Sequence, residues 1–302
     1  MMRYFFAVLW NLFVSVVWIS QVHACPCGCS VAGPLSFQAA GQMRVVSQLG
    51  TERPLGSYDA EGDLYQERGP DQILEWSQSL GYALNAAHSI SATVPLLMNA
   101  RYSGERNTSL GDPSLGWRYG IPGAIIVGDG WISSSLTLAS KFPVAKSVNE
   151  MSEDPYSMDI HGNGYYELAA GVDTAWTNAV WTVTPGAGVI WRNPRWDTIA
   201  GEYIRRTPGL GTRADLSVGY NWIGSGELKA FVRRDWRGQD QLADRLIEDS
   251  GSLSHSLGVV TSLRIAEQTN MSVQLLRKGL TGLDYGATRL FSVRVSVEKT
   301  LS

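Results

Sequence analysis

The chain has 302 residues, of which 44% are hydrophobic and 18% are charged, and its formal net charge is −3 at pH 7. This hydrophobic fraction excludes an intrinsically disordered chain, and the mildly acidic balance argues against a nucleic-acid-binding protein. After residue 24 no run of about 18 apolar residues occurs, which excludes a bundle of membrane-spanning helices. Few charges combined with 32 glycines and 11 tryptophans favour an all-β secreted protein or a membrane β-barrel.

Residues 1–24 have the pattern of a secretory signal peptide. Arg3 gives a short positive region, an apolar core follows over residues 4–19, and Ala24 provides a small residue at the cleavage site. The segment is short and no stop-transfer sequence follows it. We therefore expect export across the inner membrane and a mature chain that begins at Cys25.

The three cysteines of the chain are Cys25, Cys27 and Cys29, so none remains for a disulfide framework in the body of the protein. Alternating thiolates suit Cu(I), or zinc with further ligands from elsewhere in the chain. Cys25 is also a candidate for lipidation after cleavage. The third interpretation is a periplasmic tail over residues 25–40 whose thiols oxidise without functional consequence.

From about residue 41 the hydrophobic pattern has a period of two, which indicates β-strands. In residues 88–101, for example, Ile90, Val94 and Leu96 share one face, while Ser89 and Thr93 share the other. This pattern predicts twelve strands, near residues 41–49, 71–84, 88–101, 111–121, 131–142, 164–176, 179–192, 212–223, 226–237, 251–265, 269–279 and 288–300.

The connections between these strands alternate in length. Odd-numbered gaps are long or of medium length, at residues 50–70, 102–110, 143–163, 193–211, 238–250 and 280–287. Even-numbered gaps are mostly tight, at 85–87, 177–178, 224–225 and 266–268, and only 122–130 is longer. Such alternation is typical of an outer-membrane barrel with short periplasmic turns and long extracellular loops. We therefore predict an all-β, antiparallel transmembrane barrel of about twelve strands over residues 41–302, with both termini in the periplasm.

Tryptophans fall near the ends of the predicted strands, where an amphipathic ring suits the membrane interface. Trp131, Trp176, Trp181 and Trp222 lie beside predicted periplasmic turns, and Trp191 and Trp236 lie near the opposite rim. The alternative is that these rings fill the core of a soluble sandwich.

If the apolar faces contact lipid, the alternate residues line the lumen. The predicted lumen-lining cations are Arg44, Arg101, Arg118, Lys141, Arg192, Lys229, Arg233, Arg264, Lys278 and Arg294. The predicted lumen-lining anions are Glu75, Glu167, Asp173, Asp215, Glu227, Asp235 and Glu298. The cationic excess predicts a preference for neutral or anionic solutes, since lining charges set pore selectivity. The alternative is that these charges pair across the wall and brace the barrel.

Three segments resemble a known family. Residues 109–119, Ser-Leu-Gly-Asp-Pro-Ser-Leu-Gly-Trp-Arg-Tyr, resemble the GLGD-x-x-L-x-x-R-Y motif of the outer-membrane transporters associated with phenol meta-degradation (MetA-like). Residues 136–143 are similar to that family's following strand, which ends in Lys-Leu-Pro, and residues 162–168 to its next, Gly-rich element. The resemblance covers roughly residues 85–302. It implies an outer-membrane barrel that passes small, often hydrophobic or aromatic, compounds and has no catalytic residues.

Two features depart from that family. The chain ends in Thr300-Leu301-Ser302 instead of the terminal aromatic residue common in outer-membrane barrels, and the cysteine tail lies outside the family pattern.

The sequence therefore predicts an integral outer-membrane channel for small solutes, with membrane lipid and a small-molecule solute as its partners and no nucleic acid. No enzyme activity and no cofactor are expected, apart from Cu or Zn at the cysteines. Two alternatives remain open at this stage: a copper-handling barrel that uses the cysteine tail, and a barrel enzyme or adhesin that acts through residues 143–163 and 193–211. The mature chain offers His88, His161 and His255 as potential general bases.

Overall fold

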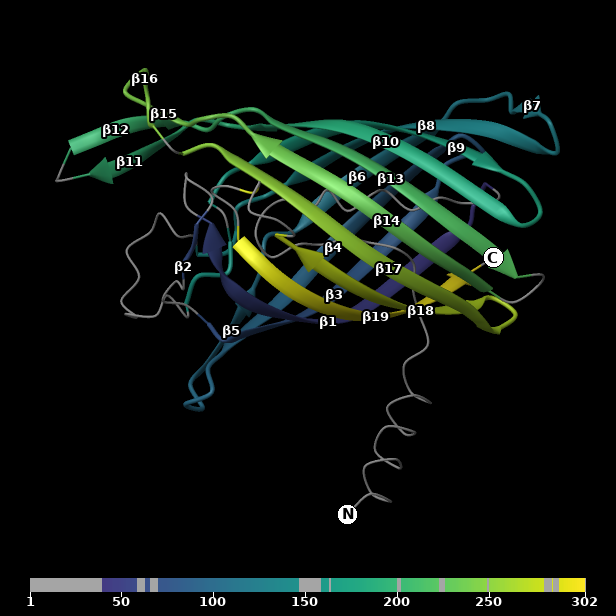
Figure 1. Ribbon diagram of the computed structural model, residues 1–302, viewed down its shortest axis with the longest axis horizontal. Helices are drawn as coiled ribbons and strands as arrows, with labels where there is room; N and C mark the ends of the chain where they lie inside the picture. The colour runs from purple at the N-terminus through teal and green to yellow at the C-terminus, as the bar shows by residue number, and fades with distance from the viewer. Residues whose placement is uncertain are drawn as a thin grey trace, which may run out of the picture.

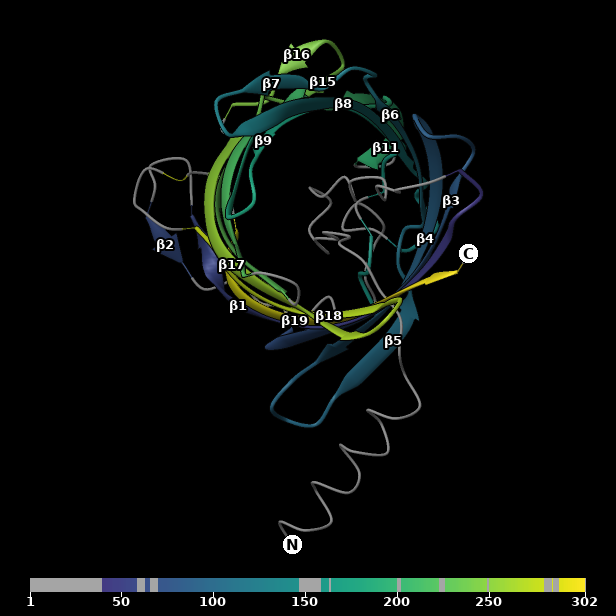
Figure 2. The same ribbon diagram turned by 90° about the vertical axis from the view of Figure 1, so that its right-hand side faces the viewer.

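Backbone hydrogen bonds join the long strands of the chain into one closed antiparallel ring (Figures 1 and 2). The computed structural model describes residues 40–58, 63–65, 70–146, 159–162, 164–199, 202–222, 226–248, 250–279, 284 and 288–301. Twelve strands follow one another round the ring in chain order, and the last strand pairs with the first. The predicted twelve-stranded barrel is thus confirmed.

The ring strands have the following bounds: β1 Met43–Tyr58, β3 Gln72–Ala83, β4 His88–Ala100, β6 Ser114–Gly120, β8 Gly130–Lys141, β9 Glu167–Thr177, β10 Trp181–Arg192, β13 Gly211–Trp222, β14 Gly226–Arg237, β17 Ser252–Ala266, β18 Thr269–Lys278 and β19 Thr288–Leu301. Three short strands, β2 Leu64–Tyr65, β5 Arg106–Leu110 and β7 Ile125–Val127, pair with β1, β4 and β8. A separate four-stranded sheet consists of β11 Arg195–Ile199, β12 Glu202–Thr207, β15 Gln241–Leu242 and β16 Arg245–Leu246. No helix among the described residues is long and apolar enough to cross a membrane.

The alternating apolar and polar residues of the strands form an apolar outer face and a polar inner face of the barrel wall. On β1 and β3, Leu49 and Leu80 are 60% and 50% exposed, whereas Gln48, Ser77 and Ser79 are at most 2% exposed. Soluble proteins bury the opposite set of residues. An apolar exterior round a polar interior is the pattern of a barrel that faces lipid.

At one end of the barrel, short turns connect neighbouring strands, and we call it the turn end. Asn85 accepts hydrogen bonds from the backbone N–H groups of Ala87 and His88 between β3 and β4. Asn178 does the same for Val180 and Trp181 between β9 and β10. Asparagine favours tight turns because its side chain satisfies nearby backbone donors.

The two ends of the described chain also lie at the turn end, because Met43 of β1 pairs with Leu301 of β19. Trp131, opposite Thr177, and Trp181, opposite Tyr220, lie at this end too. The other end, here called the loop end, carries the longer connections and the sheet of β11, β12, β15 and β16 (Figure 1).

Several predicted connections hold more strand than the sequence indicated. The first strand does not end at residue 49 but continues to Tyr58, because Thr51–Ser57 still pair with β19, with a register shift between Pro54 and Gly56. Proline and glycine resemble a loop in the sequence, yet both are tolerated where a strand bulges. The predicted gaps 122–130, 193–211 and 238–250 contain β7, β11 with β12, and β15 with β16.

The predicted strand 111–121 is interrupted. Residues 106–110 form β5 and residues 114–120 form β6, and Gly111, Asp112 and Pro113 separate the two. Both segments pair with β4, but only β6 pairs with β8 on its other side. In Figure 2, β5 diverges from the ring of strands. The hydrogen-bonded ladder between the strands is therefore interrupted on the side of β5 that faces away from β4, toward the loop end.

The seam that closes the ring is stabilised by Arg294 of β19. Its guanidinium donates to Glu52 of β1 at 2.5 Å and lies 3.5 Å from Glu75 of β3. All three side chains are at most 3% exposed. A buried cation between two buried carboxylates joins three consecutive strands of the ring.

We predict that Arg294→Ala lowers the free energy of unfolding by about 3–5 kcal/mol, because it leaves two carboxylates buried without the cation between them. Urea unfolding of the barrel refolded in lipid vesicles measures this change. Arg277→Ala, which removes an exposed arginine of neighbouring β18, is the matched control and should change stability by less than about 0.5 kcal/mol. Equal losses for the two variants would contradict the role of Arg294.

Candidate functional site in the barrel lumen

The predicted lumen-lining charges differ in how much solvent reaches them. Fully buried are Glu75, Glu167, Arg192, Lys278, Arg294 and Glu298. Half-buried are Arg44, Arg101, Arg118, Lys141, Asp173, Asp215, Glu227, Lys229, Arg233 and Asp235, and Arg264 is exposed. Nearly all of these side chains are thus shielded, although the outward-facing residues between them are exposed.

Many of these charges form ion pairs along the wall. Arg44 lies 2.6 Å from Glu298, Lys229 lies 3.3 Å from Glu227, and Arg192 pairs with Glu167. Arg213 donates from Nε to Asp235 at 2.8 Å. Lys229 and Glu227 lie on the same strand, β14, whereas the other three pairs join neighbouring strands and brace the barrel, which is the alternative that the sequence left open.

Three charged residues with ion-pair partners, Arg213, Glu52 and Asp112, are absent from the lumen-lining residues that the sequence predicts. Arg213 follows directly from the alternation that selected Asp215, so the signal was present. Glu52 was assigned to a predicted loop, because β1 was expected to end at residue 49. Asp112 was assigned to the start of a strand, whereas it lies at the break between β5 and β6.

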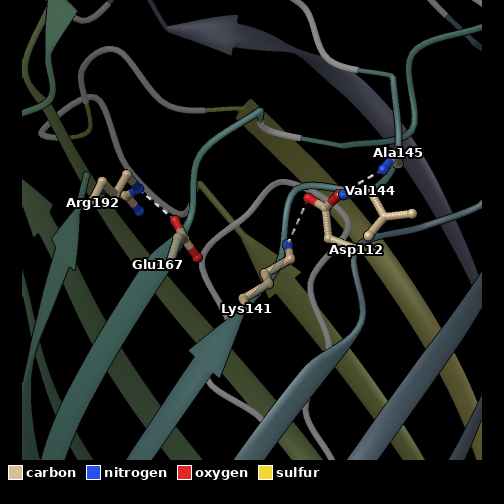
Figure 3. A network of polar contacts seen from close by, with 6 residues as sticks. All are labelled: Asp112, Lys141, Val144, Ala145, Glu167 and Arg192. Atoms are coloured by element: carbon tan, nitrogen blue, oxygen red, sulfur yellow. Dashed lines mark hydrogen bonds and ion pairs between the residues drawn. The ribbon is translucent and has the colours of Figure 1, made fainter. Parts of the chain in front are cut away.

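Asp112 organises the break in the wall (Figure 3). Its Oδ1 accepts hydrogen bonds from the backbone N–H groups of Val144 and Ala145, at 3.1 and 3.0 Å. Its Oδ2 lies 3.7 Å from Nζ of Lys141, which pairs across the ladder with Glu167. Asp112 itself is 5% exposed. A buried carboxylate thus supplies the hydrogen-bond acceptor for the segment that follows β8, beside the point where β6 begins.

The segment around His161 packs against the same break. His161 lies with Nδ1 3.1 Å from the carbonyl oxygen of Asp159 and Nε2 3.3 Å from that of Asn107 in β5. The amide of Asn99, an inward-facing residue of β4, donates to the carbonyl of Ile160. β5 pairs with β4 on one side, and the contact with His161 adds a side-chain connection at Asn107.

Gly162 is required by close packing at this point. A Cβ on Gly162 would lie 2.7 Å from Oδ1 of Asp112 and 2.9 Å from Cβ of Ala145. Any larger residue would push the segment away from Asp112. The Gly-rich start at residue 162, which carries part of the family resemblance, thus has a packing reason.

The three histidines of the mature chain contact an aromatic ring, backbone carbonyl groups and a carboxylate. His88 stacks on Tyr119 with ring centroids 4.8 Å apart. His255 contacts the buried carboxylate of Asp284, with Nδ1 2.6 Å from Oδ1. Within the described ranges, no hydrogen bond joins any of the three histidines to a serine or threonine hydroxyl. The His255–Asp284 pair joins β17 to the connection before β19, a contact that the sequence did not indicate.

No group of three or more potential metal ligands occurs among the described residues. Cys25, Cys27 and Cys29 lie outside them, as does the predicted signal peptide, so copper or zinc binding by the tail and lipidation of Cys25 stay predictions. The region 193–211, proposed as an enzyme or adhesin loop, forms the hairpin of β11 and β12. Much of 143–163 lies outside the described residues.

No protein-family model and no curated protein matches the chain. Solved structures do match it. The COG4313 outer membrane channel from Pseudomonas putida F1 superposes with a TM-score of 0.64 at 13% identity, over 88% of this chain and 97% of that one. The NanC porin follows with a TM-score of 0.49 at 12% identity, over 84% of this chain and all of that one. At these identities the similarity establishes the fold, an outer-membrane type of β-barrel.

We predict that Asp112→Ala releases the segment after β8, because two backbone donors and one lysine lose a shared buried acceptor. Trypsin cleavage of the detergent-refolded protein after Lys146 should accelerate about tenfold or more, as expected for lost hydrogen bonds to a charged group. Asp112→Asn retains an oxygen at the position of Oδ1 and should accelerate cleavage much less. Equal cleavage of the wild type and Asp112→Ala would show that Asp112 does not hold this segment.

Proposed function

We propose that the protein is an outer-membrane channel for small solutes. The observation that carries this proposal is the contrast between the apolar exterior and a half-buried row of charges on the inner wall, Arg118, Asp173, Asp215 and Arg233. Charged side chains that stay partly solvated inside a closed barrel are the lining of a wet path. Passage through such a path requires no bond chemistry, so the proposed role is transport and not catalysis.

This role implies a location and an orientation. An apolar belt of exposed leucine, valine and tryptophan side chains requires lipid around the barrel. Short turns and both chain ends would then face the periplasm, and the loop end would face outward, as is usual for outer-membrane barrels. Lipid and a small-molecule solute are the partners that this arrangement needs.

Single-channel recording tests the channel directly. We expect the mature protein, refolded and inserted in a planar bilayer in simple salt at neutral pH, to give stable ohmic steps. A continuous aqueous lumen produces such steps. Insertion without conductance, verified by the protein's resistance to carbonate extraction, would contradict the proposal.

We further propose that the solutes include hydrophobic or aromatic compounds, as the resemblance to the phenol meta-degradation transporters implies. The break beside β5 supports this assignment. There the wall is held by the side chains of Asp112 and His161, and Leu110 at the end of β5 is 53% exposed. An apolar solute can leave a polar lumen sideways only where the backbone ladder is interrupted, because a continuous ladder leaves no gap.

We predict that Leu110→Asp lowers the uptake of an apolar aromatic probe, such as toluene, into proteoliposomes by severalfold and leaves the conductance for KCl unchanged. The reason is that a carboxylate beside the break opposes the passage of an apolar solute toward lipid. Leu115→Asp is the matched control, because Leu115 is 51% exposed on β6, where pairing with β8 is intact. If both variants reduce uptake equally, the break is not the route.

A further inference from the structure

One side of the lumen is more open to solvent than the other. On the β19–β1–β3 side, Glu52 and Glu75 are 1% and 2% exposed. On the side formed by β6, β9, β13 and β14, the inward-facing charges Arg118, Asp173, Asp215 and Arg233 are half-buried, and Glu167 at the start of β9 is buried. Solutes in the lumen therefore meet the second wall.

Within that wall, the charges Asp173, Asp215 and Arg233 lie at one level of the barrel. Asp173 of β9 and Asp215 of β13 are the two cross-strand neighbours of Gly186 on β10, and Arg233 of β14 is the neighbour of Asp215. Arg118 of β6, two strands from β9, is close enough to act electrostatically on Asp173. Across the strands the signs run positive, negative, negative, positive.

Gly186 lets two carboxylates lie over one backbone position. A Cβ on Gly186 would lie 2.6 Å from Oδ1 of Asp173 and 3.0 Å from Oδ2 of Asp215, so both carboxylates lean over the same glycine. Because Gly186 has no side chain, Asp173 and Asp215 come close together at one level of the wall.

Arg118, Asp173 and Asp215 are not members of the bracing ion pairs. Arg213 is bonded to Asp235, and Lys229 is paired with Glu227. In the described part of the chain, Arg118, Asp173 and Asp215 make no hydrogen bond and no ion pair, and all three are partly exposed to the lumen. Two adjacent carboxylates repel each other, and a positive group that contacts both relieves that repulsion.

We propose that Arg118, Asp173, Asp215 and Arg233 form a recognition site for zwitterionic solutes, small molecules that carry both an ammonium and a carboxylate group. The ammonium binds on the lumen side of the Asp173 and Asp215 carboxylates, and the solute carboxylate faces Arg118 or Arg233. A simple anion is attracted by one arginine and repelled by the carboxylate pair. A simple cation is attracted by the carboxylates and repelled by the flanking arginines.

This assignment rests on the proposed channel function. It names a different class of solute from the one that the charge count of the sequence predicts, which is neutral or anionic. The count treats all cations alike, whereas the pairing removes Arg213, Lys229 and Arg192 from the charges that a solute meets. What remains along the open wall has both signs side by side.

The test uses fluxes of three solutes of similar size into proteoliposomes that contain the mature protein: alanine, lactate and lactamide. Alanine is a zwitterion, lactate an anion and lactamide uncharged. We expect alanine to enter about two- to fivefold faster than the other two, the range set by partly exposed charge pairs. In Asp173→Asn/Asp215→Asn this advantage should disappear while the lactamide flux is unchanged.

Two further variants separate the site from the lining in general. Asp215→Asn alone should reduce the alanine advantage, whereas Glu227→Gln, which removes a half-buried but paired carboxylate of neighbouring β14, should leave it intact. Arg118→Gln should slow alanine and leave lactamide unaffected. Reversal potentials of the double aspartate variant in a KCl gradient should shift toward chloride selectivity, because Arg118 and Arg233 remain.

The outcomes distinguish the two proposals. If lactamide and salt pass but alanine has no advantage, or if Glu227→Gln has the same effect as Asp215→Asn, the recognition site is overturned and the channel stands. If no solute passes and no conductance is seen in the wild type, the channel function fails, and the recognition site fails with it. Heat-modifiable migration on gels verifies that each variant is folded.

Discussion

The structure depends on the pairing of its last strand with its first. In a bilayer each backbone N–H and C=O must find a partner within the protein, and only a closed ring of strands leaves no unpaired edge. Here β19 pairs with β1 along nearly its whole length, from Met43–Leu301 to Ser57–Thr288. Arg294 reinforces that seam with Glu52 and Glu75. Once the ring is closed, every strand has a lipid face and a lumen face, and alternation assigns each side chain to one of them.

The same requirement explains the unusual polarity of Asp112. β8 ends at Lys141, opposite Ser114 at the start of β6, and the backbone donors of Val144 and Ala145 beyond it need other acceptors. A single buried carboxylate accepts both hydrogen bonds, and Lys141 balances part of its charge. The barrel is thus interrupted at a point where side chains replace backbone pairing. Side-chain contacts are more easily rearranged than a ladder, which suits the lateral exit that we propose for apolar solutes.

Charged residues at equivalent positions of the alternating pattern have different roles in the lumen. Arg294 and Arg233 both occupy inward positions of the alternating pattern. Arg294 is enclosed between two carboxylates at the seam, and burial makes it part of the scaffold. Arg233 is half-buried beside Asp215, on the wall that solvent reaches. The difference lies in what covers each side chain.

The barrel and the twelve strands of its ring can be predicted from the sequence, because a period of two and the spacing of turn residues are local properties of the chain. The positions of Trp131 and Trp181 near a barrel end can be predicted too, since both lie beside turns that the sequence shows. The pairing of the charges, their exposure to solvent and the break in the ladder follow from the tertiary structure alone. Glu52 and Arg294 are 242 positions apart, and no local pattern specifies that they meet. Ring closure and strand register bring such residues together, and both are properties of the whole barrel instead of any one strand.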